Sequence, residues 1–251
     1  MSEAVRTEYE RAVRGLWEAL YETDSTDDVP KEVQNPIGFR LERARRLAAV
    51  SSVLSARLPT ASFLYLAAEG TDGIARFLAS RAWREREREP GESFPPLASS
   101  ARAFATYLTD GGWPAGRPDW QWELARAELD LNYGELTPSG EAAGIGVRPA
   151  VGTRLRVSPY DTVDYARRVA LKKAQMPWEQ VLDTVRPVAR ATAQLVPGGG
   201  TGAGRTLILR DAEASALAWL VEGERVPTTE PSDALLDRLV RVGAFAREAA
   251  G

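Results

Sequence analysis

The chain of 251 residues contains no histidine and no cysteine. This double absence excludes nucleophilic sites of the Ser-His-Asp or Cys-His kind, because each needs a residue that the chain lacks. It also argues against zinc, haem and non-haem iron sites, whose usual protein ligands are imidazole and thiolate. Carboxylate acid–base chemistry, magnesium or calcium binding, and binding of a partner with its own chemistry stay open. We therefore expect a protein that is not an enzyme and that holds no metal and no cofactor.

The chain also has little excess of charge of either sign. Its 32 basic and 35 acidic residues leave a formal net charge of −3, so no net positive field attracts DNA, RNA or an anionic membrane. The sequence has no apolar run of about 18 residues and no signal-peptide core at its start. Without cysteine it needs no oxidising compartment. We expect a cytoplasmic protein with no membrane partner, for which nucleic acid is disfavoured.

Apolar residues make up 44% of the chain and charged residues 27%, which is typical of a globular protein. The length is enough for two domains, each with its own core. The pattern changes from helical to mixed along the chain. We predict an α+β fold with a helical domain at residues 1–136, a linker at 137–149, and a smaller α/β domain of the winged-helix type at 150–251.

In the first half, apolar residues recur at spacings of three and four, which is typical of amphipathic helices. The predicted helices cover 5–21, 41–58, 60–68, 72–83, 97–108 and 118–131. Trp120 and Trp122 are two residues apart and so face different ways on a helix. We expect exposed aromatic side chains among Trp113, Trp120 and Trp122 to form an interface with a partner.

In the second half, apolar residues at 153–157 alternate with Arg154 and Arg156, which predicts a half-buried strand. Asp161 is placed to cap a following helix. A further helix is predicted at 178–195, kinked or restarted at Pro187. The aliphatic segment 206–209 is predicted to be a strand.

A glycine-rich run at 197–204 invites comparison with a phosphate-binding loop. Such a loop follows a strand and opens a helix, whereas this run precedes the predicted strand at 206–209. We interpret it as a flexible loop.

The order after residue 206 is strand, helix, turn, helix and then Gly243-Ala244-Phe245, which is typical of a winged helix-turn-helix. Such a module can bind DNA or a peptide. Its last helix balances Asp233 and Asp237 against Arg238 and Arg241, which disfavours a reader of the major groove. A winged-helix transcriptional regulator that binds DNA stays the alternative function.

A set of dispersed residues resembles a known family. They are Arg46, Leu58-Pro59, Phe77-Leu78, Leu97, Phe104, Tyr107-Leu108, Trp120, Leu124-Ala125, Glu128, Ser158-Pro159-Tyr160, Val163-Asp164, Leu207-Ile208-Leu209-Arg210, Leu217, Leu220 and Gly223. Through them the chain resembles the partner proteins of multinuclear non-haem iron oxidases in the biosynthesis of ribosomal, modified peptides, a family that includes the methanobactin partner subunit. The segment 172–204 looks longer than the family usually has.

The resemblance implies a helical domain followed by a peptide-recognition domain, and a role in presenting the precursor peptide to an oxidase whose irons are bound by the other chain. An extended leader peptide can add a strand to an open sheet edge. We therefore predict that the peptide docks on the two candidate strands, at Thr153, Leu155, Val157, Thr206, Leu207, Ile208 and Leu209.

A third possibility is an enzyme that uses carboxylates. Glu123 with Glu128, and Asp161 with Asp164, are the candidate pairs. Solvation and helix capping account for such residues more often than catalysis does.

Overall fold

The computed structural model describes residues 33–87, 97–133, 147–198, 206–222 and 231–247. By their internal contacts the residues divide into two compact units, 1–117 and 118–251. The first is helical and the second contains all the strands of the described residues, so the α+β class is confirmed. The predicted helix at 5–21 lies outside the described residues.

The first unit is built from helices. They are α2 (Pro36–Arg57), α3 (Pro59–Ala79), α4 (Arg81–Arg84), α5 (Leu97–Tyr107) and the π-helical turn η1 (Leu108–Gly112). Of these, α2 and α3 begin at proline and α4 begins at a polar cap, Ser80. At the start of α2, the side chain of Asn35 accepts a hydrogen bond of 2.9 Å from the Gly38 amide, which satisfies an amide that the first turn leaves unpaired. The break predicted near Gly70 is present as a kink in α3, where Gly70 has a φ of 61°.

Aromatic rings form the core of this unit. Phe77 lies 5.0 Å from Phe104 and 5.4 Å from Trp83 between ring centroids, in edge-to-face arrangements. Tyr65 lies 5.2 Å from Phe104 in the same way. Edge-to-face pairs are a favourable geometry for aromatic side chains, so these rings hold α3, α4 and α5 together.

The second unit combines helices with two small antiparallel sheets. Its elements are α6 (Asp119–Tyr133), β1 (Val147–Pro149), β2 (Arg154–Tyr160), α7 (Thr162–Lys173), α8 (Trp178–Thr184), β3 (Ala189–Val196), β4 (Leu207–Arg210), α9 (Asp211–Glu222), α10 (Asp233–Arg241) and β5 (Phe245–Arg247). One sheet has the order β2-β3-β4, and the other pairs β1 with β5. The last strand, β5, which follows the helices α9 and α10, therefore pairs with β1 and not with β4.

The central strand β3 corrects the prediction of one helix over 178–195. Only α8 is helical there, and residues 189–196 form the middle of the sheet, with Leu195 paired to Leu155 on one side and Leu207 on the other. The segment 172–204 thus supplies a strand without which β2 and β4 would not be joined. It is part of the fold of this chain.

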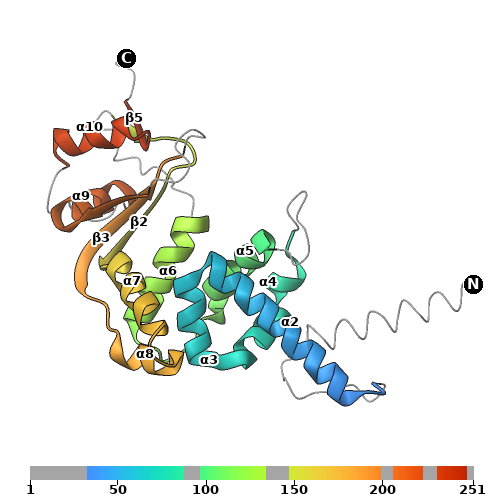
Figure 1. The fold of residues 1–251 in the computed structure, drawn as a ribbon. Coiled ribbons are helices and arrows are strands. Elements are labelled where there is room, and N and C mark those ends of the chain that lie inside the picture. The colour runs from blue at the N-terminus through green and yellow to red at the C-terminus, as the bar shows by residue number, and fades with distance from the viewer. Residues whose placement is uncertain (1–32, 88–96, 134–146, 199–205, 223–230, 248–251) are drawn as a thin grey trace, which may run out of the picture. The chain divides into compact units, whose positions relative to one another are not determined.

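Helices cover both faces of this sheet (Figure 1). On one face, α9 packs with Ala214 and Leu217 against Leu155, Leu195 and Leu209, all of them buried. On the other face α6 contacts β2 and β3. The alternation of a strand thus places an apolar side under α9 and a polar side under α6.

The boundary between the units differs from the predicted one. We expected the helical domain to run to residue 136, but α6 groups with the second unit, which begins at Pro118. Most of the predicted linker at 137–149 lies outside the described residues, and its last three residues form β1.

Candidate peptide-docking edge

The two strands predicted to dock a peptide are the two edges of the three-stranded sheet. β3 lies between β2 and β4 and is paired on both sides, whereas β2 and β4 are each paired on one side within the described residues. An edge strand presents unpaired amide and carbonyl groups that a further strand can use. The two edges differ in what surrounds them.

The β2 edge is poorly suited to accept a strand. Leu155 is 7% exposed and belongs to the core, and Thr153, just before the strand, is buried with its hydroxyl donating to the Ala244 carbonyl at 2.9 Å. Val157 is half-buried. Pro159 has no amide hydrogen, and the pairing with β3 shifts register between Ser158 and Tyr160. Proline and a shift of this kind are common ways of blocking edge pairing.

The β4 edge is more open. Leu209 is buried under α9 and Leu207 is half-buried, whereas Ile208, 36% exposed, is on the opposite face. Thr206 and Arg210 at the two ends are exposed. Of the seven predicted docking residues, only Thr206 and Ile208 are exposed in the structure, and both belong to this edge.

Charged side chains gather at the end of β4. Arg190 on β3 donates from Nε and Nη2 to the Asp211 carboxylate, at 2.8 Å for the closest contact. These hydrogen bonds lower the pKa of Asp211. The Nε atom of Arg210 lies 3.3 Å from a carboxylate oxygen of Asp161, which is 4% exposed. Asp211 also has a φ of 51°, a left-handed conformation that Asp and Asn tolerate better than most side chains do.

The three tryptophans predicted to form a partner interface are half-buried, and none is in the exposed class. Trp120 packs edge-to-face on Tyr165 with 5.8 Å between ring centroids, and the Arg186 guanidinium lies 5.6 Å from its ring centre. Trp120 thus has a packing role inside the second unit. The interface role of Trp113 and Trp122 stays a prediction.

The carboxylates considered for catalysis have structural contacts. Glu123 binds Arg156 at 2.9 Å, and Asp161 caps α7 by accepting from the Asp164 amide at 2.9 Å. Asp164 itself pairs with Arg168 at 2.6 Å. Within the described residues no group of three or more Asp or Glu side chains is placed to hold a metal ion.

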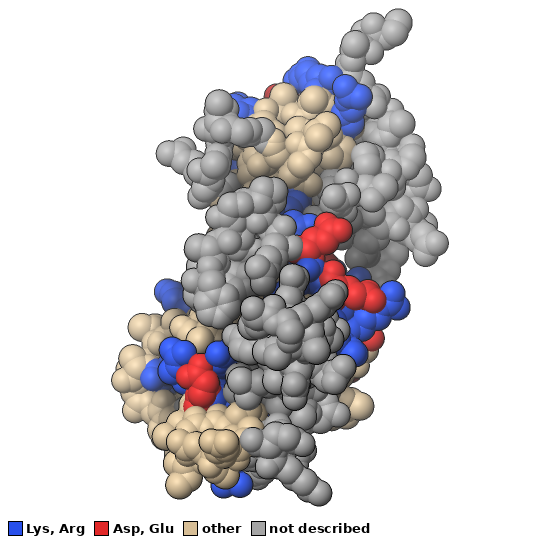
Figure 2. All heavy atoms as spheres, turned by 90° about the vertical axis from the view of Figure 1, so that its right-hand side faces the viewer, with Lys and Arg blue, Asp and Glu red and all other residues tan. Residues whose placement is uncertain are grey.

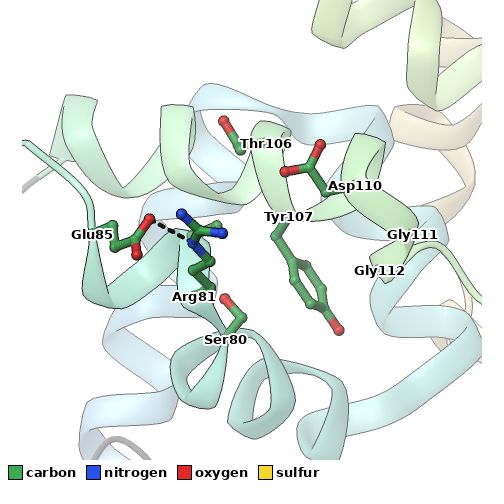
Figure 3. A pocket seen from close by; sticks show the side chains of 9 residues that line it. Ser80, Arg81, Glu85, Thr106, Tyr107, Asp110, Gly111 and Gly112 are labelled. Carbon is green, nitrogen blue, oxygen red and sulfur yellow. Dashed lines mark hydrogen bonds and ion pairs between the residues drawn. The ribbon is translucent and has the colours of Figure 1, made fainter.

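A pocket of about 750 Å³ lies in the helical unit (Figure 3) and was not expected from the sequence. It is lined by Ser80, Arg81, Ala82, Glu85, Thr106, Tyr107, Asp110, Gly111 and Gly112. The cation of Arg81 is paired with Glu85 at 2.7 Å. Cation, carboxylates and hydroxyl groups are mixed along the wall, so the pocket favours no one class of ligand.

Two arginines at and near α10 are paired with carboxylates. Arg238 approaches Glu213 at 3.3 Å and Arg247 pairs with Asp237 at 2.5 Å. On the face seen in Figure 2, acidic and basic side chains of the described residues lie together in the middle and lower part of the view, and a mostly basic group lies at its top. Searching the described residues gives no helix of sufficient length and apolarity to cross a membrane.

The signal for β3 was present in the sequence and was missed. Ala191, Ala193 and Leu195 alternate with Arg190, Thr192 and Gln194, which is the period of two that a half-buried strand shows. Alanine favours helices, and this preference concealed the alternation.

No protein-family model matches the chain, and a search of curated proteins gives no match. Its function must therefore be argued from the sheet edge and its surroundings.

Proposed function

We propose that this chain is a non-catalytic partner subunit that binds a ribosomal precursor peptide and presents it to a multinuclear non-haem iron oxidase in the cytoplasm. The observation that supports this proposal is the β4 edge. Within the described residues β4 is paired on one side only, by β3, and has exposed side chains at Thr206, Ile208 and Arg210, so an extended peptide can bind to its other side through its backbone.

The proposal also fits the composition. An oxidase brings its own irons and their ligands, so its partner needs no imidazole or thiolate, and this chain has neither. The partner's work is then recognition: main-chain hydrogen bonds supply affinity, and alternate side chains supply selection.

Affinity purification from the native host tests the proposal. The intact chain is the bait, and mass spectrometry identifies what co-purifies. We expect the wild-type chain to capture an iron oxidase together with a short ribosomal peptide. Ile208→Pro should lose the peptide and retain the oxidase, because proline disturbs the backbone pairing of the edge. Ile208→Ala is the matched control and should retain both.

Position 208 is chosen because Ile208 is partly exposed, whereas proline in place of the core residue Leu155 would disturb the fold itself. Circular dichroism establishes that each variant is folded. A wild-type bait that captures neither partner contradicts the proposal. A folded Ile208→Pro chain that retains the peptide shows that the peptide binds away from β4.

A further inference from the structure

The side chains of β4 alternate between the face covered by α9 and the face on which α6 contacts β2 and β3, and those on the second face are exposed at β4 and are called the open face here. Leu207 and Leu209 belong to or pack on the core under α9. Ile208 and Arg210 face the other way, and both are exposed. A strand added to this edge continues the alternation, so two of its side chains would lie beside Ile208 and Arg210 on the open face.

The guanidinium of Arg210 has room for a ligand. Its side chain is 43% exposed and meets Asp161 through Nε. Its two Nη atoms make no hydrogen bond to any other residue in the part of the chain that the structure describes. These N–H donors form a planar fork that matches a carboxylate.

The neighbouring charges favour an acidic over a basic ligand side chain. Asp211 is occupied by two nitrogen atoms of Arg190. Asp161 is buried, and one of its oxygens caps α7 while the other faces Arg210. Neither carboxylate is open to a basic group of an incoming peptide, whereas the Nη atoms of Arg210 are open to an acidic one.

We propose, resting on the proposed function, that the peptide bound along β4 carries an acidic residue beside Arg210 and an aliphatic residue beside Ile208. Both existing pairings of this sheet are antiparallel, and an antiparallel addition fixes the order. The residue opposite Arg210 then precedes the residue opposite Ile208 by two positions. The recognised sequence is Asp or Glu, any residue, then Leu, Ile or Val.

A phage-displayed library of random short peptides, panned on the intact chain, tests this proposal. We expect the enriched peptides to share the acidic-x-aliphatic order. The best of them is then synthesised, together with a version in which the acidic residue is its amide, and both are titrated. Removing the charge should weaken binding to the wild-type chain about tenfold, as expected for loss of a charge-assisted hydrogen bond.

The same pair of peptides should bind equally well to Arg210→Gln, because the partner of the carboxylate is gone. Glutamine is used because a glutamate there would face the buried Asp161. Arg247→Gln is the matched control, an exposed arginine on the other sheet, and should keep the tenfold difference. Circular dichroism verifies that each variant is folded.

The outcomes separate the two proposals. Equal binding of the two peptides to the wild-type chain overturns the acidic requirement, and enrichment of the reversed order overturns the antiparallel register. If either occurs while Ile208→Pro still abolishes binding, docking on β4 stands. Absence of any enriched peptide, or full binding by a folded Ile208→Pro chain, overturns docking on β4 and this inference with it.

Discussion

Among the described residues two tyrosines, Tyr65 and Tyr165, are fully buried, and their hydroxyl groups are in opposite situations. Tyr65 donates to the Gly73 carbonyl at 3.0 Å, so the 3.1 Å contact with the Tyr107 hydroxyl uses the proton of Tyr107. The Tyr165 hydroxyl is buried and has no hydrogen-bond partner in the described part of the chain. Burial raises the pKa of both tyrosines far above the ordinary value. Both stay neutral at physiological pH, and only one of them is paired.

This contrast predicts opposite effects for the same substitution. Tyr65→Phe removes the hydrogen bond to the Gly73 carbonyl and leaves the Tyr107 hydroxyl without its acceptor, so we expect the free energy of unfolding to fall by about 1–3 kcal/mol. Tyr165→Phe removes a buried polar atom that gains nothing from the fold, so the free energy of unfolding should stay the same or rise. Urea unfolding of both variants measures the difference. A loss in Tyr165→Phe as large as that in Tyr65→Phe would show that Tyr165 has a partner.

At the scale of elements, Arg156 joins β2 to α6. Its two Nη atoms contact Glu123 at 2.9 Å and Asp130 at 3.0 Å, and its side chain is 13% exposed. A largely buried cation between two carboxylates depends on both, because desolvation penalises each charge that is left alone.

Arg156→Met should therefore lower the free energy of unfolding by about 2–3 kcal/mol, at or just below the range seen when a buried ion pair loses one partner. Arg126→Met is the matched control. Arg126 approaches the same Asp130 at 3.6 Å from one turn away, with 48% of its side chain exposed, and such surface pairs contribute less than about 1 kcal/mol. Equal losses in the two variants in urea unfolding would mean that the contact between β2 and α6 does not depend on Arg156.

The elements that the sequence predicted well are those with local signals. The boundary at Pro59 between the predicted helices 41–58 and 60–68, the break at Gly70 and the cap at Asp161 depend on signals within a few residues, so a local pattern reveals them. The strand β3 was hidden because alanine-rich segments favour helix. Its alternation is compatible with a strand, and the pairing with β2 and β4 decides between strand and helix.

The candidate site was predictable in part. The sequence indicated both edge strands, but not which of them stays open. That difference depends on long-range placement: Pro159 and a register shift at β2, and the position of Arg210 beside Asp161. Pairing order couples segments far apart in the chain, and no local pattern reports it.

At the scale of the whole molecule, the sequence pattern and the structure group α6 differently. Its periodicity is that of the preceding helices, so it was grouped with them. In the structure it groups with the second unit, where Glu123 and Asp130 hold Arg156 and Trp120 packs on Tyr165. These contacts join residues at least 26 positions apart in the chain, the nearest pair being Asp130 and Arg156.

Two fragments test this assignment. Residues 118–251 should fold alone, because they include the apolar core under α9 and the helix that covers the polar face of β2. Residues 137–251, which begin at the predicted linker, lack α6 and leave Arg156 without Glu123 and Asp130. Loss of α6 removes both ion pairs of Arg156 and uncovers the face of β2 and β3 that α6 contacts, and Tyr165 also loses the Trp120 ring. We expect dispersed amide signals in NMR spectra and a cooperative unfolding transition for the longer fragment, and neither for the shorter one. If both fragments fold with similar midpoints in urea, α6 is dispensable to the second unit, and the boundary predicted at residue 136 describes its folding better than the one at 117.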